Sequence, residues 1–75
     1  MKLSKYDLCD TCRNLIIMEG YTFGEYIETC VANRGGDLNP MDYYNICMMI
    51  PINLKSKGGC VKCIKNFEKK RDNLK

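Results

Sequence analysis

The chain has 75 residues, with 12 basic and nine acidic side chains and a net charge of +3. It contains six cysteines, no histidine and no tryptophan, and its only serines are Ser4 and Ser56. The length predicts a single domain over residues 1–75, and the composition excludes serine triads, histidine-based acid–base catalysis and metal sites with histidine ligands.

The first predicted helix spans residues 4–18. Ser4 followed three residues later by Asp7 is a helix-start signal, and Gly20 is expected to end the helix. Leu8, Cys12, Leu15 and Ile16 would then share one face. A break at residues 10–11, with Asp10 capping a shorter helix, is an equally good interpretation.

Three further helices are predicted. Thr22 and Glu25 form a capping-box pattern for the second helix, which glycines 35 and 36 would end. Asn39 and Pro40 begin the third helix, which Pro51 would end, and residues 53–59 are expected to form a loop. The fourth helix begins at residue 60, and its basic end, residues 70–75, is expected to fray. The fold class is therefore mainly α, a small domain of about four short helices with at most one short strand pair, to which residues 50–54 would contribute.

Two C-x-x-C units are the strongest chemical signal. Four thiolates arranged as a tetrahedron are a common structural site for Zn²⁺, and a two-residue spacer lets both sulfurs of a unit reach one metal. The second unit follows two glycines and opens a helix, where the positive helix end favours thiolates. The sequence predicts one zinc site stapling the domain, with four ligands: Cys9, Cys12, Cys60 and Cys63.

Other interpretations of the cysteines remain open. A C-x-x-C unit, especially Cys60 with Cys63, is also typical of thiol–disulfide redox proteins, and six cysteines would suit three disulfides in an exported protein. Cys30 and Cys47 lie on apolar helix faces, so they are expected to be buried core thiols. Because no imidazole base is present to activate a thiol, we expect a binding module rather than an enzyme.

Charge divides unevenly along the chain. Residues 1–54 carry a net charge of −3 and residues 55–75 a net charge of +6. In the last helix Lys62, Lys65 and Lys69 recur at spacings of three and four, which puts them on one face. Such a row can contact nucleic-acid phosphates, or it can simply be a solvated face. An unknown protein is the partner we expect first, and nucleic acid second.

No secretion signal or membrane segment is expected from the sequence. Residues 1–10 are polar, and the longest apolar run, residues 46–52, is far shorter than the ~20 residues that a transmembrane helix needs. These features predict a cytoplasmic protein without a membrane partner.

Two resemblances accompany these patterns. A cysteine pair near one end and a C-x-x-C unit at the start of the last helix are similar to the ligand layout of treble-clef zinc fingers. The stretch T-F-G-E-Y-I-E-T-C-V-A-N-R-G-G-D-L-N-P, residues 22–40, resembles small cysteine-rich proteins of clostridial mobile elements. That resemblance implies an accessory role on a mobile element and no particular site residues.

Overall fold

The computed structural model describes residues 2–31 and 37–74, without the side chains of residues 30 and 31. The predicted mainly α fold is confirmed. The elements in chain order are the 3₁₀ turn η1 (Lys5–Asp7), α1 (Asp10–Leu15), β1 (Ile17–Met18), β2 (Tyr21–Thr22), α2 (Phe23–Tyr26), the π-helix η2 (Ile27–Val31), α3 (Pro40–Lys57) and α4 (Val61–Asp72).

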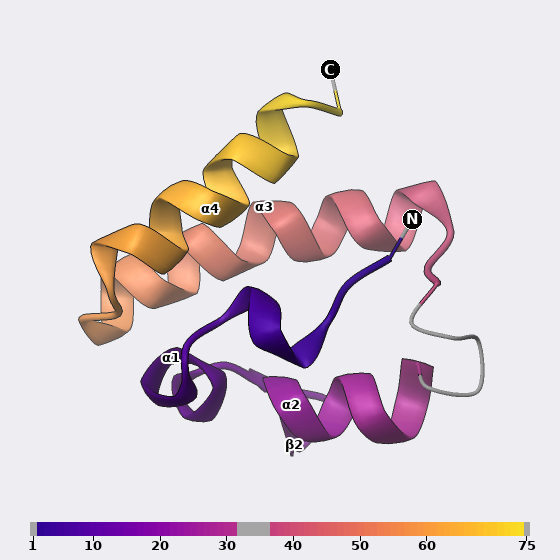
Figure 1. Ribbon diagram of the computed structural model, residues 1–75, viewed down its shortest axis with the longest axis horizontal. Coiled ribbons are helices and arrows are strands. Elements are labelled where there is room, and N and C mark those ends of the chain that lie inside the picture. Colours follow the sequence, from indigo (N-terminus) through magenta and orange to yellow (C-terminus); the bar gives the residue numbers. More distant parts are fainter. Residues whose placement is uncertain (1, 32–36, 75) are drawn as a thin grey trace.

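The helices form two layers around one core. Helices α3 and α4 pack against each other as an antiparallel pair, and the N-terminal segment, α1 and α2 lie together on one side of this pair (Figure 1). Phe23 of α2 and Phe67 of α4 meet in the core edge to face, with ring centroids 6.1 Å apart, and both are fully buried. This aromatic pair joins the two layers.

The predicted first helix is split in two, so the interpretation with a break is the nearer one. Ser4 caps η1 together with Asp7, as expected, but Leu8 is extended and the N-cap of α1 is Cys9 rather than Asp10. In a continuous helix the Cys9 N–H would donate to the carbonyl of Lys5. It donates instead to the Cys63 sulfur, so a tertiary contact replaces the helical one.

The short strand pair lies elsewhere than predicted. Residues 50–54 are helical, and the two strands instead flank Glu19 and Gly20, with Ile17 opposite Thr22. Both turn residues have positive φ, 54° and 86°. This is the backbone of a two-residue hairpin turn, so Gly20 reverses the chain rather than ending a helix.

Helix starts were predicted better than helix ends. The Thr22–Glu25 capping box is present, and Asn39 caps α3 by accepting a hydrogen bond of 2.9 Å from the Asp42 N–H. The expected stop at residues 35–36 lies outside the described residues.

The prediction that Pro51 ends the third helix is wrong. Helix α3 continues to Lys57, so most of the predicted loop 53–59 is helical. Proline inside a helix removes one hydrogen bond and costs ~3 kcal/mol. Ile50 and Leu54 lie on either side of it with no exposed surface, and burying two such side chains contributes about 1.5–3 kcal/mol each. Core packing therefore outweighs the local preference of proline.

Two glycines make the turn from α3 into α4. Gly58 has φ of 72°, the left-handed conformation of a helix C-cap, and the Gly59 N–H donates to the Leu54 carbonyl at 2.7 Å. A Cβ atom at position 59 would lie only 2.6 Å from Cδ2 of Leu54. Cys60 follows this turn directly.

We expect Gly59→Ala to destabilise the protein by about 1–3 kcal/mol, because the added methyl group overlaps the buried Leu54. Urea titration followed by circular dichroism measures the change. Gly24→Ala is the matched control, since its Cβ atom would lie 3.6 Å from the Arg13 side chain, an ordinary contact. Equal stability of both variants would contradict the prediction.

None of the helices in residues 2–31 and 37–74 is long and apolar enough to cross a membrane.

Candidate metal centre

The two C-x-x-C units have the same local structure. Cys9 is the N-cap of α1 and Cys60 is the N-cap of α4. In each unit the cap carbonyl accepts the first helical hydrogen bond, from Arg13 at 2.9 Å and from Ile64 at 3.1 Å. The second cysteine of each unit therefore lies one turn inside its helix.

Reciprocal hydrogen bonds join the two units. The Cys9 N–H donates to the Cys63 sulfur at 3.4 Å, and the Cys60 N–H donates to the Cys12 sulfur at 3.3 Å. The first residue of each unit thus contacts the last sulfur of the other. Residues about 50 positions apart in the chain are held together at one end of the α3–α4 layer.

Three of the four predicted ligands come together. The sulfur atoms of Cys9, Cys12 and Cys63 all lie within 4.8 Å of one another. Four sulfurs at ~2.3 Å from a tetrahedral zinc would be about 3.8 Å apart, so little movement separates the cluster from a metal site. The Cys60 sulfur is outside this group, although its backbone N–H touches the group at Cys12.

The three thiols differ in acidity. The pKa of Cys9 is lowered to about 7 because the backbone N–H and the side chain of Cys12 hydrogen-bond to its sulfur. Burial raises the pKa of Cys12, and burial also raises the pKa of Cys63 to about 12. A divalent cation favours the deprotonated form of a thiol that coordinates it, so a metal bound by these sulfurs would displace the protons of Cys12 and Cys63.

A surface pocket of about 540 Å³ opens beside the cluster. The Asn66 side chain lines it and donates a hydrogen bond to the Asp7 carbonyl at 3.1 Å. Nothing in the sequence indicated that Tyr6 and Asn66 would lie here, because only the folded chain brings the N-terminal segment against α4. The lining residues are Tyr6, Asp7, Cys9, Cys60, Lys62, Cys63 and Asn66.

The structure places four of the five remaining predicted residues. Cys47 is fully buried in the core, as predicted, and burial raises its pKa. The Cys30 side chain lies outside the described residues. Lys62, Lys65 and Lys69 are all exposed along α4.

Comparison of the chain with protein-family models, curated proteins and solved structures finds no match. The resemblances to treble-clef zinc fingers and to mobile-element proteins therefore stay predictions. The geometry of the cysteine cluster alone carries the functional argument.

Proposed function

We propose that the protein is a non-catalytic binding module stabilised by one Zn²⁺, with Cys9, Cys12, Cys60 and Cys63 as ligands. The observation that carries the proposal is the reciprocal pair of N–H···S hydrogen bonds between the two C-x-x-C units. Backbone N–H donors commonly orient metal-bound groups and tune their charge. Here they also align the two units, since each donor belongs to one unit and each sulfur to the other.

The equivalence of the two units supports Cys60 as the fourth ligand. Cys9 and Cys60 occupy the same helix position, and Cys9 already belongs to the sulfur cluster. Cys60 lines the same pocket as Cys9 and Cys63 and is exposed, so other residues do not cover it. Four protein thiolates would leave the metal no position for water or substrate, which is typical of structural rather than catalytic zinc.

The ligand chemistry favours zinc among the common metals. Thiolate ligands select soft or borderline ions such as Zn²⁺ over Mg²⁺ and Ca²⁺, which prefer oxygen. Zn²⁺ has no redox chemistry of its own, so its contribution here would be to hold the starts of α1 and α4 together.

We expect the purified, untagged protein to contain one equivalent of zinc. Loss of a residue that hydrogen-bonds to a metal ligand typically lowers metal affinity about 10–100-fold, and we expect Cys60→Ser to lower zinc affinity at least as strongly. Elemental analysis and competition with a chromogenic chelator measure these quantities. Cys47→Ala is the matched control, because Cys47 is a fully buried thiol in the core and not a member of the sulfur cluster.

Three results would contradict the proposal. Less than about half an equivalent of zinc in both the protein as purified and the protein refolded with zinc would exclude a zinc module. Wild-type affinity in Cys60→Ser would exclude Cys60 as a ligand. A bound iron ion in place of zinc would contradict the metal assignment, and its absorbance would reveal it.

A thiol–disulfide redox protein is the second candidate, favoured by the exposure of Cys9 beside the sulfur of Cys63. The contact differs from the expected Cys60–Cys63 pair. Zinc-bound thiolates resist alkylation until a chelator is added, whereas a redox thiol is alkylated at once. Reduction of insulin at catalytic protein levels would favour this candidate over the zinc module.

A further inference from the structure

An exposed aromatic side chain and the first of a row of lysines lie beside the cysteine cluster. Tyr6 and Lys62 line the same pocket, and Lys65 and Lys69 continue the row along α4. We call these four residues, together with Asn66, the tyrosine–lysine face.

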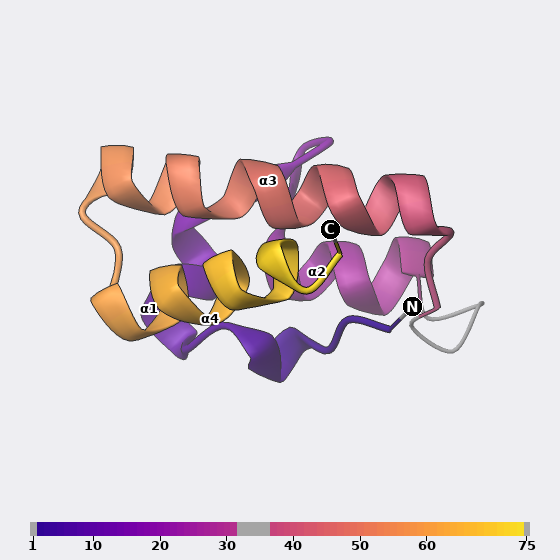
Figure 2. The ribbon, with the colours of Figure 1, turned by 90° about the horizontal axis from the view of Figure 1, so that it is seen from above.

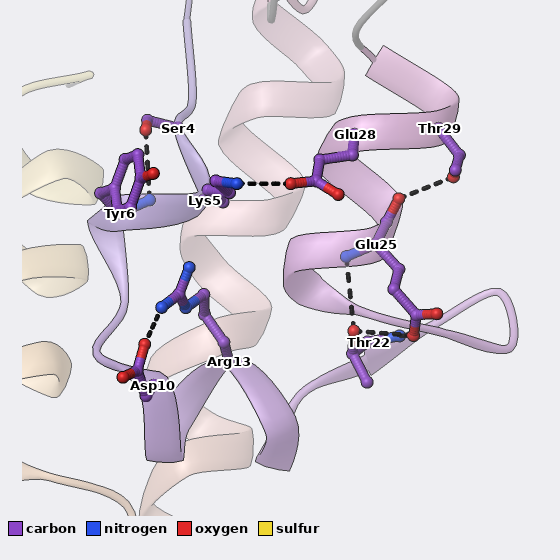
Figure 3. A network of polar contacts seen from close by, with 9 residues as sticks. All are labelled: Ser4, Lys5, Tyr6, Asp10, Arg13, Thr22, Glu25, Glu28 and Thr29. Atoms are coloured by element: carbon purple, nitrogen blue, oxygen red, sulfur yellow. Dashed lines mark hydrogen bonds and ion pairs between the residues drawn. The ribbon is translucent and has the colours of Figure 1, made fainter.

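Tyr6 is largely exposed. Its exposed fraction is 76%, the largest among the large hydrophobic side chains of the described residues. The Lys5 ammonium lies 5.3 Å from the ring centroid and the Arg13 guanidinium carbon 5.5 Å from it, which are cation–π distances. Figure 3 shows Tyr6 on the opposite side of its segment from the Lys5 contact with Glu28. Two cations therefore lie over the ring, while most of the side chain remains exposed to solvent.

The lysines of the face are charges without a partner. Among the described residues, no ion pair or hydrogen bond engages the ammonium groups of Lys62, Lys65 and Lys69, whereas Lys55 pairs with Glu68 at 3.2 Å. At ~1.5 Å rise per residue the row is about 10 Å long. Phosphates along one strand of a duplex are spaced about 3.4 Å apart along its axis, so the row spans roughly three nucleotides at that spacing.

Nearby carboxylates are neutralised by other cations. The Asp7 carboxylate lies 3.5 Å from the Lys70 ammonium, the Glu28 carboxylate pairs with Lys5, and Asp10 pairs with Arg13 (Figure 3).

Two other acidic residues lie away from this face. Glu19 and Asp42 line a separate pocket between the hairpin and α3. Figure 2 shows the hairpin on one side of α3 and the N-terminal segment on the other. Five of the seven acidic residues in residues 1–54 are therefore either paired or remote from the face.

We propose that the tyrosine–lysine face binds single-stranded nucleic acid, with a base stacked on Tyr6 and the phosphates running along Lys62, Lys65 and Lys69. Stacking on an aromatic ring requires the open face of an unpaired base, which a duplex does not offer. The inference rests on the proposed function, because Lys62 lies between the two proposed ligands Cys60 and Cys63, so the metal would fix its position next to Tyr6.

The experiment is fluorescence anisotropy of the zinc-loaded full chain with a labelled oligothymidine of roughly 12 nucleotides, within the range of known single-strand sites, and with a duplex of equal length. Three phosphate contacts predict a slope of log affinity against log salt of about −2 for the single strand. We expect the slope to fall near zero in a triple variant that combines Lys62→Gln, Lys65→Gln and Lys69→Gln. Lys55→Gln, a lysine that is already ion-paired, is expected to leave it unchanged.

Tyr6 gives the decisive comparison. We expect Tyr6→Leu to weaken single-strand binding about 5- to 150-fold without changing the salt slope, and Tyr6→Phe to retain binding, because stacking needs the ring and not the hydroxyl. Tyr21→Leu is the matched control, since Tyr21 is 41% exposed but lies on the hairpin.

Several results would overturn the inference. These are no binding at low salt, tighter binding of the duplex with no effect of Tyr6→Leu, or equal competition by polyglutamate, which would point to an acidic protein instead. Zinc content measured on the same samples separates the two proposals. A protein that holds one equivalent of zinc but binds no oligonucleotide would overturn only this inference. A protein that holds no zinc would overturn the proposed function. If that metal-free protein also binds no oligonucleotide, both proposals are overturned.

Discussion

Chelation of the metal is expected to lower the melting temperature by roughly 15–30 °C, or to unfold the chain outright. A ligand present at about 1,000 times its dissociation constant stabilises the folded state by about 4 kcal/mol. For a domain of this size each 1 kcal/mol shifts the melting temperature by about 4–8 °C. The core of so short a chain rarely supplies more than ~3–5 kcal/mol by itself, so the metal would provide a comparable share of the stability.

Circular dichroism during thermal melting measures this shift with and without EDTA, and zinc added back in excess should restore the original curve. Cys9→Ser is the appropriate control, because a variant that has lost a proposed ligand should respond much less to the chelator. An unchanged melting temperature in EDTA, for a protein shown to have lost its zinc, would contradict coupling of metal binding to folding.

Part of the candidate site was predictable because the C-x-x-C units carry their chemistry locally, and three of the four predicted cysteines form the sulfur cluster. The sequence placed the second unit at a helix start and the first unit inside a helix or at a break in it, and in the structure both units begin helices. The contacts between the units were not predictable, since the N–H···S bonds join residues 48 and 54 positions apart. The same tertiary contact splits the first helix at Leu8, which no local pattern favoured over a continuous helix.

The predictions of helix ends failed where core packing overrides the local conformational preference of the sequence. Pro51 is a strong local stop, yet burial of Ile50 and Leu54 carries α3 past it to the true stop at Gly58. Conversely, the capping signals at Thr22 and Asn39 succeeded because a cap satisfies backbone N–H groups of its own helix and needs no distant partner. Tyr6 is a further case of a tertiary feature, because its place beside α4 depends on the whole fold.

Phe67→Ala is expected to cost about 3–5 kcal/mol, the usual range for removing a fully buried phenylalanine. Phe67 has no exposed surface and packs edge to face on Phe23, so the change leaves a cavity between the two layers and also removes an aromatic contact. This loss equals roughly the whole stability expected of the core without metal. The metal-free variant should therefore be unfolded, whereas the zinc-loaded variant should keep its helices, because the metal still holds the starts of α1 and α4 together.

Urea titration of the zinc-loaded and metal-free forms measures both effects. Val61→Ala serves as the control on the same helix, since Val61 is 64% exposed and its truncation is expected to change stability by less than about 0.5 kcal/mol. A zinc-loaded Phe67→Ala protein that unfolds completely would show that the metal cannot compensate for the core. A metal-free variant that stays folded would show that the aromatic pair does not hold the layers together.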